Sequence, residues 1–143
     1  MKTLQTLIKL QKSLVDEQRQ HLAKLQEIVD AIANAIAQVE IEKTREQLAA
    51  ENNPEAQATY GAFLKQITAK ARNLENERQA AAHAVELARA KLSELFEEQK
   101  RYEIADAARA EAEAKEEQRR IRIALDEVGS ISYGRRKGSE DKF

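Results

Sequence analysis

Two groups of closely spaced glutamates carry most of the acid–base side chains of this chain of 143 residues. They are Glu94, Glu97 and Glu98, followed by Glu111, Glu113, Glu116 and Glu117. Paired carboxylates act as general acid and base only where a cleft gives them different environments. Here lysines and arginines stand beside them in a pattern typical of exposed helix faces. The spacing therefore predicts surface ion pairs rather than a catalytic site, and we expect no enzymatic activity.

The two histidines, His21 and His83, lie far apart in the sequence. Neither has a histidine or cysteine three or four residues away, which is the spacing of many zinc sites. The chain has no Cys, which excludes disulfides and thiol catalysis. It also lacks a phosphate-binding loop and a glycine fingerprint. We expect no cofactor and no metal.

Basic residues concentrate toward the C-terminus, beginning with Arg119, Arg120 and Arg122 and continuing with Arg135, Arg136 and Lys137. A nucleic-acid partner would favour a strongly basic face, whereas the net charge is −1 and acidic residues interleave the basic ones. No group of aromatic residues offers a platform for stacking bases. We expect this end to bind protein and not nucleic acid, with phosphate binding kept as an alternative.

Bulky apolar residues gather just after the single proline, Pro54. They are Tyr60, Phe63, Leu64 and Ile67. Partly exposed aromatic residues often anchor a partner protein. The same residues can equally pack the tip of a helical hairpin, and both interpretations stay open.

The elements that carry these residues follow from apolar heptads on both sides of Pro54. The heptads run through Met1, Ile8, Val15, Leu22, Val29 and Ile36 before it, and through Tyr60, Ile67, Leu74, Ala81, Ala88, Leu95 and Tyr102 after it. A spacing of seven residues is typical of helices that supercoil against each other. It predicts an all-α fold: an antiparallel coiled-coil hairpin over residues 1–128, with helices 3–49 and 55–128 and a turn at 50–55. The second helix is the longer one, and a flexible, disordered polar tail is expected at 129–143.

An antiparallel hairpin also predicts which core residues face each other. Setting Leu4 opposite Tyr102 predicts the further pairs Gln11–Leu95, Gln18–Ala88, Leu25–Ala81, Ile32–Leu74 and Val39–Ile67. Beyond Tyr102, roughly 25 helical residues then have no partner in the same chain, a length of about 38 Å. Polar residues at core positions, namely Gln11, Gln18, Gln99 and Arg78, either fix this register or mark a weak zone where a partner helix can insert.

The composition agrees with a coiled coil, because 34% of the residues are charged and only one is proline. Polar residues interrupt the N-terminal apolar patch too early for a signal peptide, and no stretch reaches the roughly 18 apolar residues of a membrane span. We therefore expect a soluble cytoplasmic protein. Leu7, Leu14 and Ile28 widen the apolar stripe of the first helix, which leaves a structural scaffold that oligomerises as an alternative.

Two segments resemble the FliJ proteins of the bacterial flagellar export apparatus. The first is Met1–Leu10 with the following Val15-Asp16-Glu17-Gln18-Arg19, and the second is Glu97–Ala105 running into a charged, Ala-rich helix. The length, the central break and the short basic tail agree with that family. The resemblance implies a soluble, non-enzymatic component of the flagellar type III export apparatus, with roles in flagellum biogenesis, motility and chemotaxis.

The resemblance also implies partners. A coiled coil similar to the central stalk of rotary ATPases would engage the hexameric export ATPase, with Arg119, Arg120 and Arg122 as the expected contact. A patch at the hairpin tip, comprising Val39, Tyr60, Phe63 and Ile67, would contact the cytoplasmic part of the export gate membrane protein. Export chaperones are further expected partners, and the protein would associate peripherally with the inner membrane through the apparatus. A virulence-type secretion system is the alternative setting.

Overall fold

The computed structural model describes residues 2–140, which form two helices, α1 (Lys2–Glu51) and α2 (Pro54–Glu140). The predicted all-α fold is confirmed, since no strand occurs in this range and α2 is the longer helix. Both helices consist largely of Ala, Leu, Glu, Lys, Arg and Gln, the residue types with the highest helix propensity. Their length therefore agrees with local preference as well as with the heptads.

The end of α2 differs from the prediction, because the helix continues to Glu140 rather than ending at Val128. Gly129, Gly134 and Gly138 suggested an end there, but each glycine costs only about 1 kcal/mol relative to alanine in a helix interior. No proline follows to interrupt the backbone hydrogen bonds. The flexibility expected for 129–143 stays a prediction, and residues 141–143 lie outside the described range.

A short break at Asn52 and Asn53 separates the helices. The Asn53 side chain accepts a hydrogen bond from the backbone N–H of Glu55 at 3.1 Å, and the Asn53 carbonyl accepts one from Gln57 at 3.1 Å. Asn53 thus caps α2, with Pro54 at the first helical position, where its missing N–H costs nothing. The capping role predicted for Asn53 is confirmed.

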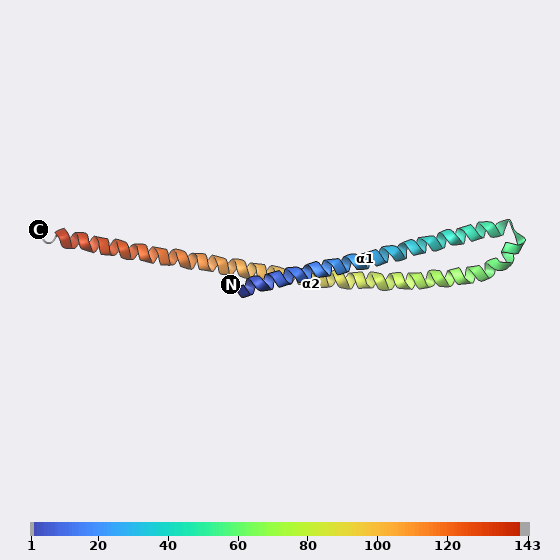
Figure 1. Ribbon diagram of the computed structural model, residues 1–143, viewed down its shortest axis with the longest axis horizontal. Helices are drawn as coiled ribbons and strands as arrows, with labels where there is room; N and C mark the ends of the chain where they lie inside the picture. The colour runs from blue at the N-terminus through green and yellow to red at the C-terminus, as the bar shows by residue number, and fades with distance from the viewer. Residues whose placement is uncertain (1, 141–143) are drawn as a thin grey trace. The chain divides into compact units, whose positions relative to one another are not determined.

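The chain divides into two units, which we treat separately. The hairpin unit comprises Leu10–Glu98, and the terminal unit comprises Met1–Lys9 together with Gln99–Phe143. Within the hairpin unit, α1 and α2 leave the turn and run antiparallel (Figure 1). Each unit thus combines a part of α1 with a part of α2.

The core of the hairpin unit is a single narrow seam. Its most buried apolar residues are Val15, Val39, Ala50, Ile67, Val85 and Ala88. None of the described side chains of the molecule falls below 2% exposure, because two helices enclose a residue from only two sides. The seam is therefore thin, as a two-helix coiled coil requires.

Two interhelical hydrogen bonds of the hairpin unit coincide with predicted core pairs. The Gln11 Nε2 group donates to the Leu95 carbonyl at 3.0 Å, and Gln18 Nε2 donates to the Ala88 carbonyl at 3.1 Å. Leu25 lines a shallow groove with Ala84 and Ala88, within one helical turn of its predicted partner Ala81. The predicted register is confirmed at these layers.

The terminal unit changes character along α2. Tyr102, Asp106 and Arg109 are half-buried, as are Leu4 and Ile8 of α1. From residue 117 to residue 135, in contrast, every side chain of α2 is exposed. This stretch has no packed partner among the described residues of its unit.

Candidate protein-binding surfaces

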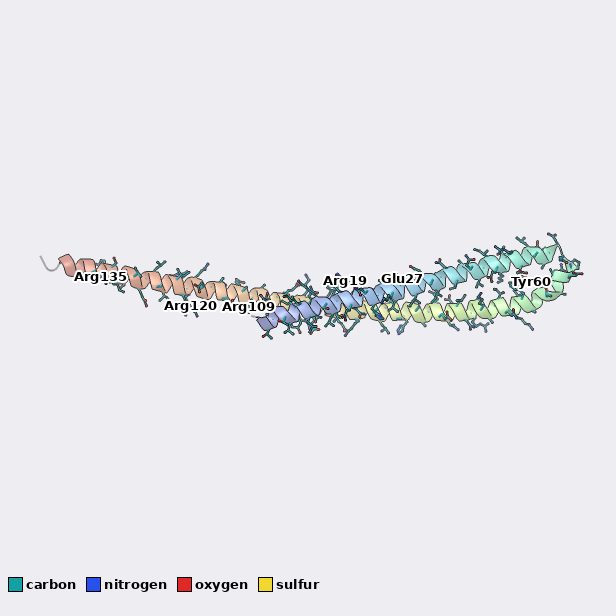
Figure 2. All side chains as sticks on the ribbon, viewed as in Figure 1. Arg19, Glu27, Tyr60, Arg109, Arg120 and Arg135 are labelled. Atoms are coloured by element: carbon teal, nitrogen blue, oxygen red, sulfur yellow. The ribbon has the colours of Figure 1, made fainter. Side chains whose placement is uncertain are left out.

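An aromatic pair lies one to two helical turns after the break, near the start of α2. The rings of Tyr60 and Phe63 are stacked, with centroids 6.2 Å apart and planes inclined by 29°. Both residues are half-buried, and Tyr60 lies close to the turn of the hairpin unit (Figure 2). Aromatic pairs in such offset geometry are stabilising and rigid. The pair can therefore pack the tip and still present ring surface to a partner.

The other two residues expected in the tip patch lie in the core. Val39 is 2% exposed and Ile67 is 5% exposed, in agreement with their predicted pairing across the seam. Their side chains support the tip but leave almost no surface for a partner. Of the four expected residues, only Tyr60 and Phe63 have accessible side chains of appreciable size.

Arg119, Arg120 and Arg122 all lie in the exposed stretch of the terminal unit. Arg119 forms an ion pair with Glu116 at 3.1 Å, and Arg120 pairs with the same carboxylate at 3.6 Å. The hydrogen bond from Arg119 lowers the pKa of Glu116 below its usual range and raises the pKa of Arg119. For Arg122, no hydrogen bond or ion pair to another described residue occurs. Arg122 is therefore the least engaged of the three guanidinium groups.

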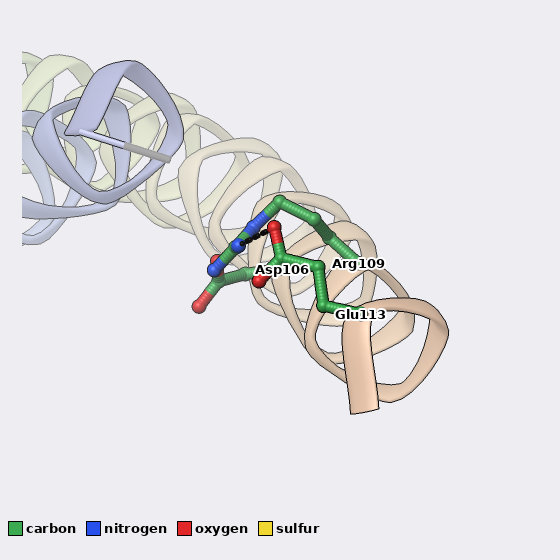
Figure 3. Close-up of polar contacts among 3 residues, drawn as sticks. All are labelled: Asp106, Arg109 and Glu113. Carbon is green, nitrogen blue, oxygen red and sulfur yellow. Dashed lines mark hydrogen bonds and ion pairs between the residues drawn. The ribbon is translucent and has the colours of Figure 1, made fainter. Parts of the chain in front are cut away.

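A carboxylate–arginine cluster in the terminal unit was not predicted. Arg109 Nη2 lies 3.0 Å from the Asp106 carboxylate, and Arg109 Nη1 lies 2.8 Å from the Glu113 carboxylate (Figure 3). These two hydrogen bonds, with Asp106 the stronger influence, raise the pKa of Arg109. The spacing of three and four residues along one helix could have identified the cluster. It joins charges on successive turns of α2.

Polar residues at core positions fall into two groups. Gln11 and Gln18 reach across the seam to backbone carbonyls, as described above. Arg78, in contrast, donates from Nε to Glu75 on its own helix at 2.9 Å, and this hydrogen bond lowers the pKa of Glu75. Gln99 likewise bonds to Glu103 at 3.0 Å. Only the α1 glutamines thus make the interhelical bonds that fix register.

The histidines lie apart from any potential metal-binding group. His21 and His83 are both exposed. Among the residues that the structure describes, no three His, Cys, Asp or Glu side chains are arranged to hold a metal ion. Within the same range, neither helix is long and apolar enough to cross a membrane. The accessible features of this chain are therefore side chains on helix faces.

Comparison with known proteins identifies the family. The family model described as "Flagellar FliJ protein" matches residues 1–138 of the chain. The chain belongs to the FliJ family. No curated protein and no solved structure matches the sequence.

Family membership makes the chain a component of the flagellar export apparatus. It confirms the resemblance seen in the N-terminal segment and in the segment from Glu97 onward. The helical hairpin that the heptads predict is thus the form in which a FliJ-family protein presents its exposed side chains. Those side chains, rather than a cleft, must make its contacts.

Proposed function

We propose that this FliJ-family protein is a non-enzymatic adaptor that connects the hexameric export ATPase with the export gate and with substrate chaperones. The observation that supports this most strongly is the exposed stretch of α2 at residues 117–135, where no side chain is packed. A helix of this length with both charged and apolar side chains in water favours a role in binding. The family membership limits the setting to flagellar export.

The arginines of this stretch are the proposed ATPase contact. Arg119 and Arg120 share one carboxylate, Glu116, so that three neighbouring guanidinium groups retain a net positive charge. Such a group attracts an acidic protein surface and accelerates association. Arg122, which has no partner among the described residues, would make the most direct contact.

A pull-down with the export ATPase of the same organism tests this contact. We expect the Arg119→Ala/Arg120→Ala/Arg122→Ala variant to retain its helical content and to lose most ATPase binding. The matched control replaces exposed arginines of the hairpin unit, Arg45→Ala and Arg72→Ala, and should bind normally. Equal retention of both variants by the ATPase would contradict the proposed contact.

The aromatic pair is the proposed contact for the cytoplasmic part of the export gate protein. Tyr60 and Phe63 stack on each other, so little conformational entropy is lost when a partner covers them. We expect Tyr60→Ala/Phe63→Ala to reduce gate binding and motility while ATPase binding persists. Leu87→Ala, which alters an exposed apolar residue away from the turn, is the control. A motile double variant with normal gate binding would refute this assignment.

The adaptor as a whole is tested by deletion of the gene. A strain without the chain should be poorly motile and should export flagellar subunits inefficiently. The localisation follows from the same proposal: the protein is cytoplasmic and reaches the inner membrane only through the apparatus. Normal motility of the deletion strain would overturn the adaptor role and favour the scaffold alternative.

A further inference from the structure

The exposed stretch of α2 carries apolar side chains that water disfavours. Ile121, Val128 and Ile131 are 52%, 64% and 58% exposed. At about 100° per residue these three side chains and Ala124 fall within an arc of about 80° on one side of the helix. We call these four residues the distal face. Arg119 and Arg122 lie outside this arc, so the distal face is separate from the proposed ATPase contact.

The distal face is complementary to itself in the reversed direction. When a second copy of the helix is laid antiparallel, Ile121 falls opposite Ile131 and Ala124 falls opposite Val128. The remaining two layers repeat these pairs by symmetry. Large and small residues thus face each other in the middle layers, as in a packed seam.

The charged residues that flank the distal face favour the same arrangement. Glu117 and Arg135 occupy the next heptad positions on either side, and both are exposed. In the antiparallel pair, Glu117 of one copy falls opposite Arg135 of the other at both ends. In a parallel pair, Glu117 would face Glu117 and Arg135 would face Arg135. Like charges directly opposite each other repel, so the antiparallel orientation is preferred.

We propose that the distal face binds the distal face of a second copy of this chain, in antiparallel orientation. The contact is isologous, because the same residues serve both copies, and it closes at two chains. Only three bulky side chains per copy take part, so the dimer is reversible and is populated at high protein concentration. This inference is independent of the proposed adaptor role.

Sedimentation velocity of the full chain tests the contact over about a hundredfold range of concentration. We expect the sedimentation coefficient to rise from the monomer value toward the dimer value. Ile121→Asp/Val128→Asp should stay monomeric throughout. Ile123→Asp, on the opposite side of the same helix and 45% exposed, should dimerise like the unaltered chain. Circular dichroism verifies that each variant remains helical.

A charge exchange tests the orientation. Glu117→Arg places a second guanidinium group opposite Arg135 at both ends and should weaken dimerisation about tenfold. The double variant Glu117→Arg/Arg135→Glu restores opposite charges and should recover dimerisation. A chain that is monomeric at every concentration overturns the proposal. So does self-association that ignores either the distal face or the charge exchange, since another surface or a parallel arrangement would then be responsible.

Discussion

At the scale of single residues, position in the seam separates side chains of similar chemistry. Ile67 is 5% exposed, whereas Ile41 on the outer side of α1 is 48% exposed. Val39 and Ile67 were expected beside Tyr60 and Phe63 in one patch, yet only the aromatic residues remain accessible. The apolar character of a residue near the turn therefore does not decide whether a partner can reach it.

This difference predicts the cost of removing each side chain. Ile67→Ala deletes buried methyl groups and should lower the free energy of unfolding by about 2 kcal/mol, because the narrow seam can partly close. Ile41→Ala should change it by less than about 0.5 kcal/mol. Urea unfolding followed by circular dichroism measures both. Equal effects would show that Ile67 does not belong to the core.

The ion pairs of the terminal unit predict a pH dependence at Glu116. The Arg119 hydrogen bond holds the pKa of Glu116 below that of the unfolded chain, which is about 4.3. Ionised Glu116 therefore stabilises this part of α2 above that pH, and the contribution is lost as the pH falls through the lower, folded pKa. An NMR titration of the Glu116 carboxyl group measures the pKa directly.

Arginine substitutions identify the cause of that shift. We expect Arg119→Ala to raise the pKa of Glu116 toward its ordinary value. Arg135→Ala, which alters a guanidinium group far along the same helix, should leave the Glu116 pKa unchanged. An unchanged pKa in Arg119→Ala would mean that the ion pair does not persist in solution.

At the scale of the elements, two glutamines determine how α1 and α2 align in the hairpin unit. Each donates a side-chain hydrogen bond to a backbone carbonyl of α2, at Leu95 and at Ala88. A heptad seam of mostly Ala, Val and Leu tolerates a shift by seven residues, since apolar layers then face other apolar layers. Polar core residues oppose such a shift at some cost in stability.

Replacing both glutamines should reveal how much they contribute to the register. We expect Gln11→Leu/Gln18→Leu to be at least as stable as the unaltered chain but less uniform in register. Because the chain has no Cys, a disulfide between Leu25→Cys and Ala81→Cys reports the native register, and one between Leu25→Cys and Ala88→Cys reports the shifted register. The shifted disulfide should form appreciably only with both glutamines replaced. A double Leu variant that forms only the native disulfide would show that the apolar layers alone fix the register.

At the scale of the whole molecule, folding and binding depend on different parts of the chain. The buried apolar residues belong to the hairpin unit, whereas residues 117–135 of the terminal unit contribute none. Ion pairs such as those of Arg119 with Glu116 hold this stretch only locally and are fully exposed to solvent. Stability thus resides mainly in the seam, and the exposed stretch is available to partners.

Truncation after Glu116 tests this division. We expect the urea midpoint of the truncated chain to remain close to that of the full chain, since no buried contact is lost. Total helical signal should fall in proportion to the residues removed, and binding of the export ATPase should disappear. A large loss of stability would show that residues beyond Glu116 support the hairpin.

The sequence by itself determined the two helices, the break capped by Asn53 and the register of the seam. Heptad spacing and capping are local or periodic properties, and antiparallel pairing follows once two heptad series flank one turn. The family also followed from segments of the chain.

The tertiary structure decided which residues of the tip are covered, because burial of Val39 and Ile67 depends on what the opposite helix places beside them. It also decided that α2 continues to Glu140 and that Arg109 joins Asp106 and Glu113. Both depend on small energies, since about 1 kcal/mol per glycine and less for an exposed ion pair decide between nearly equal alternatives. Residue types alone do not resolve differences of that size.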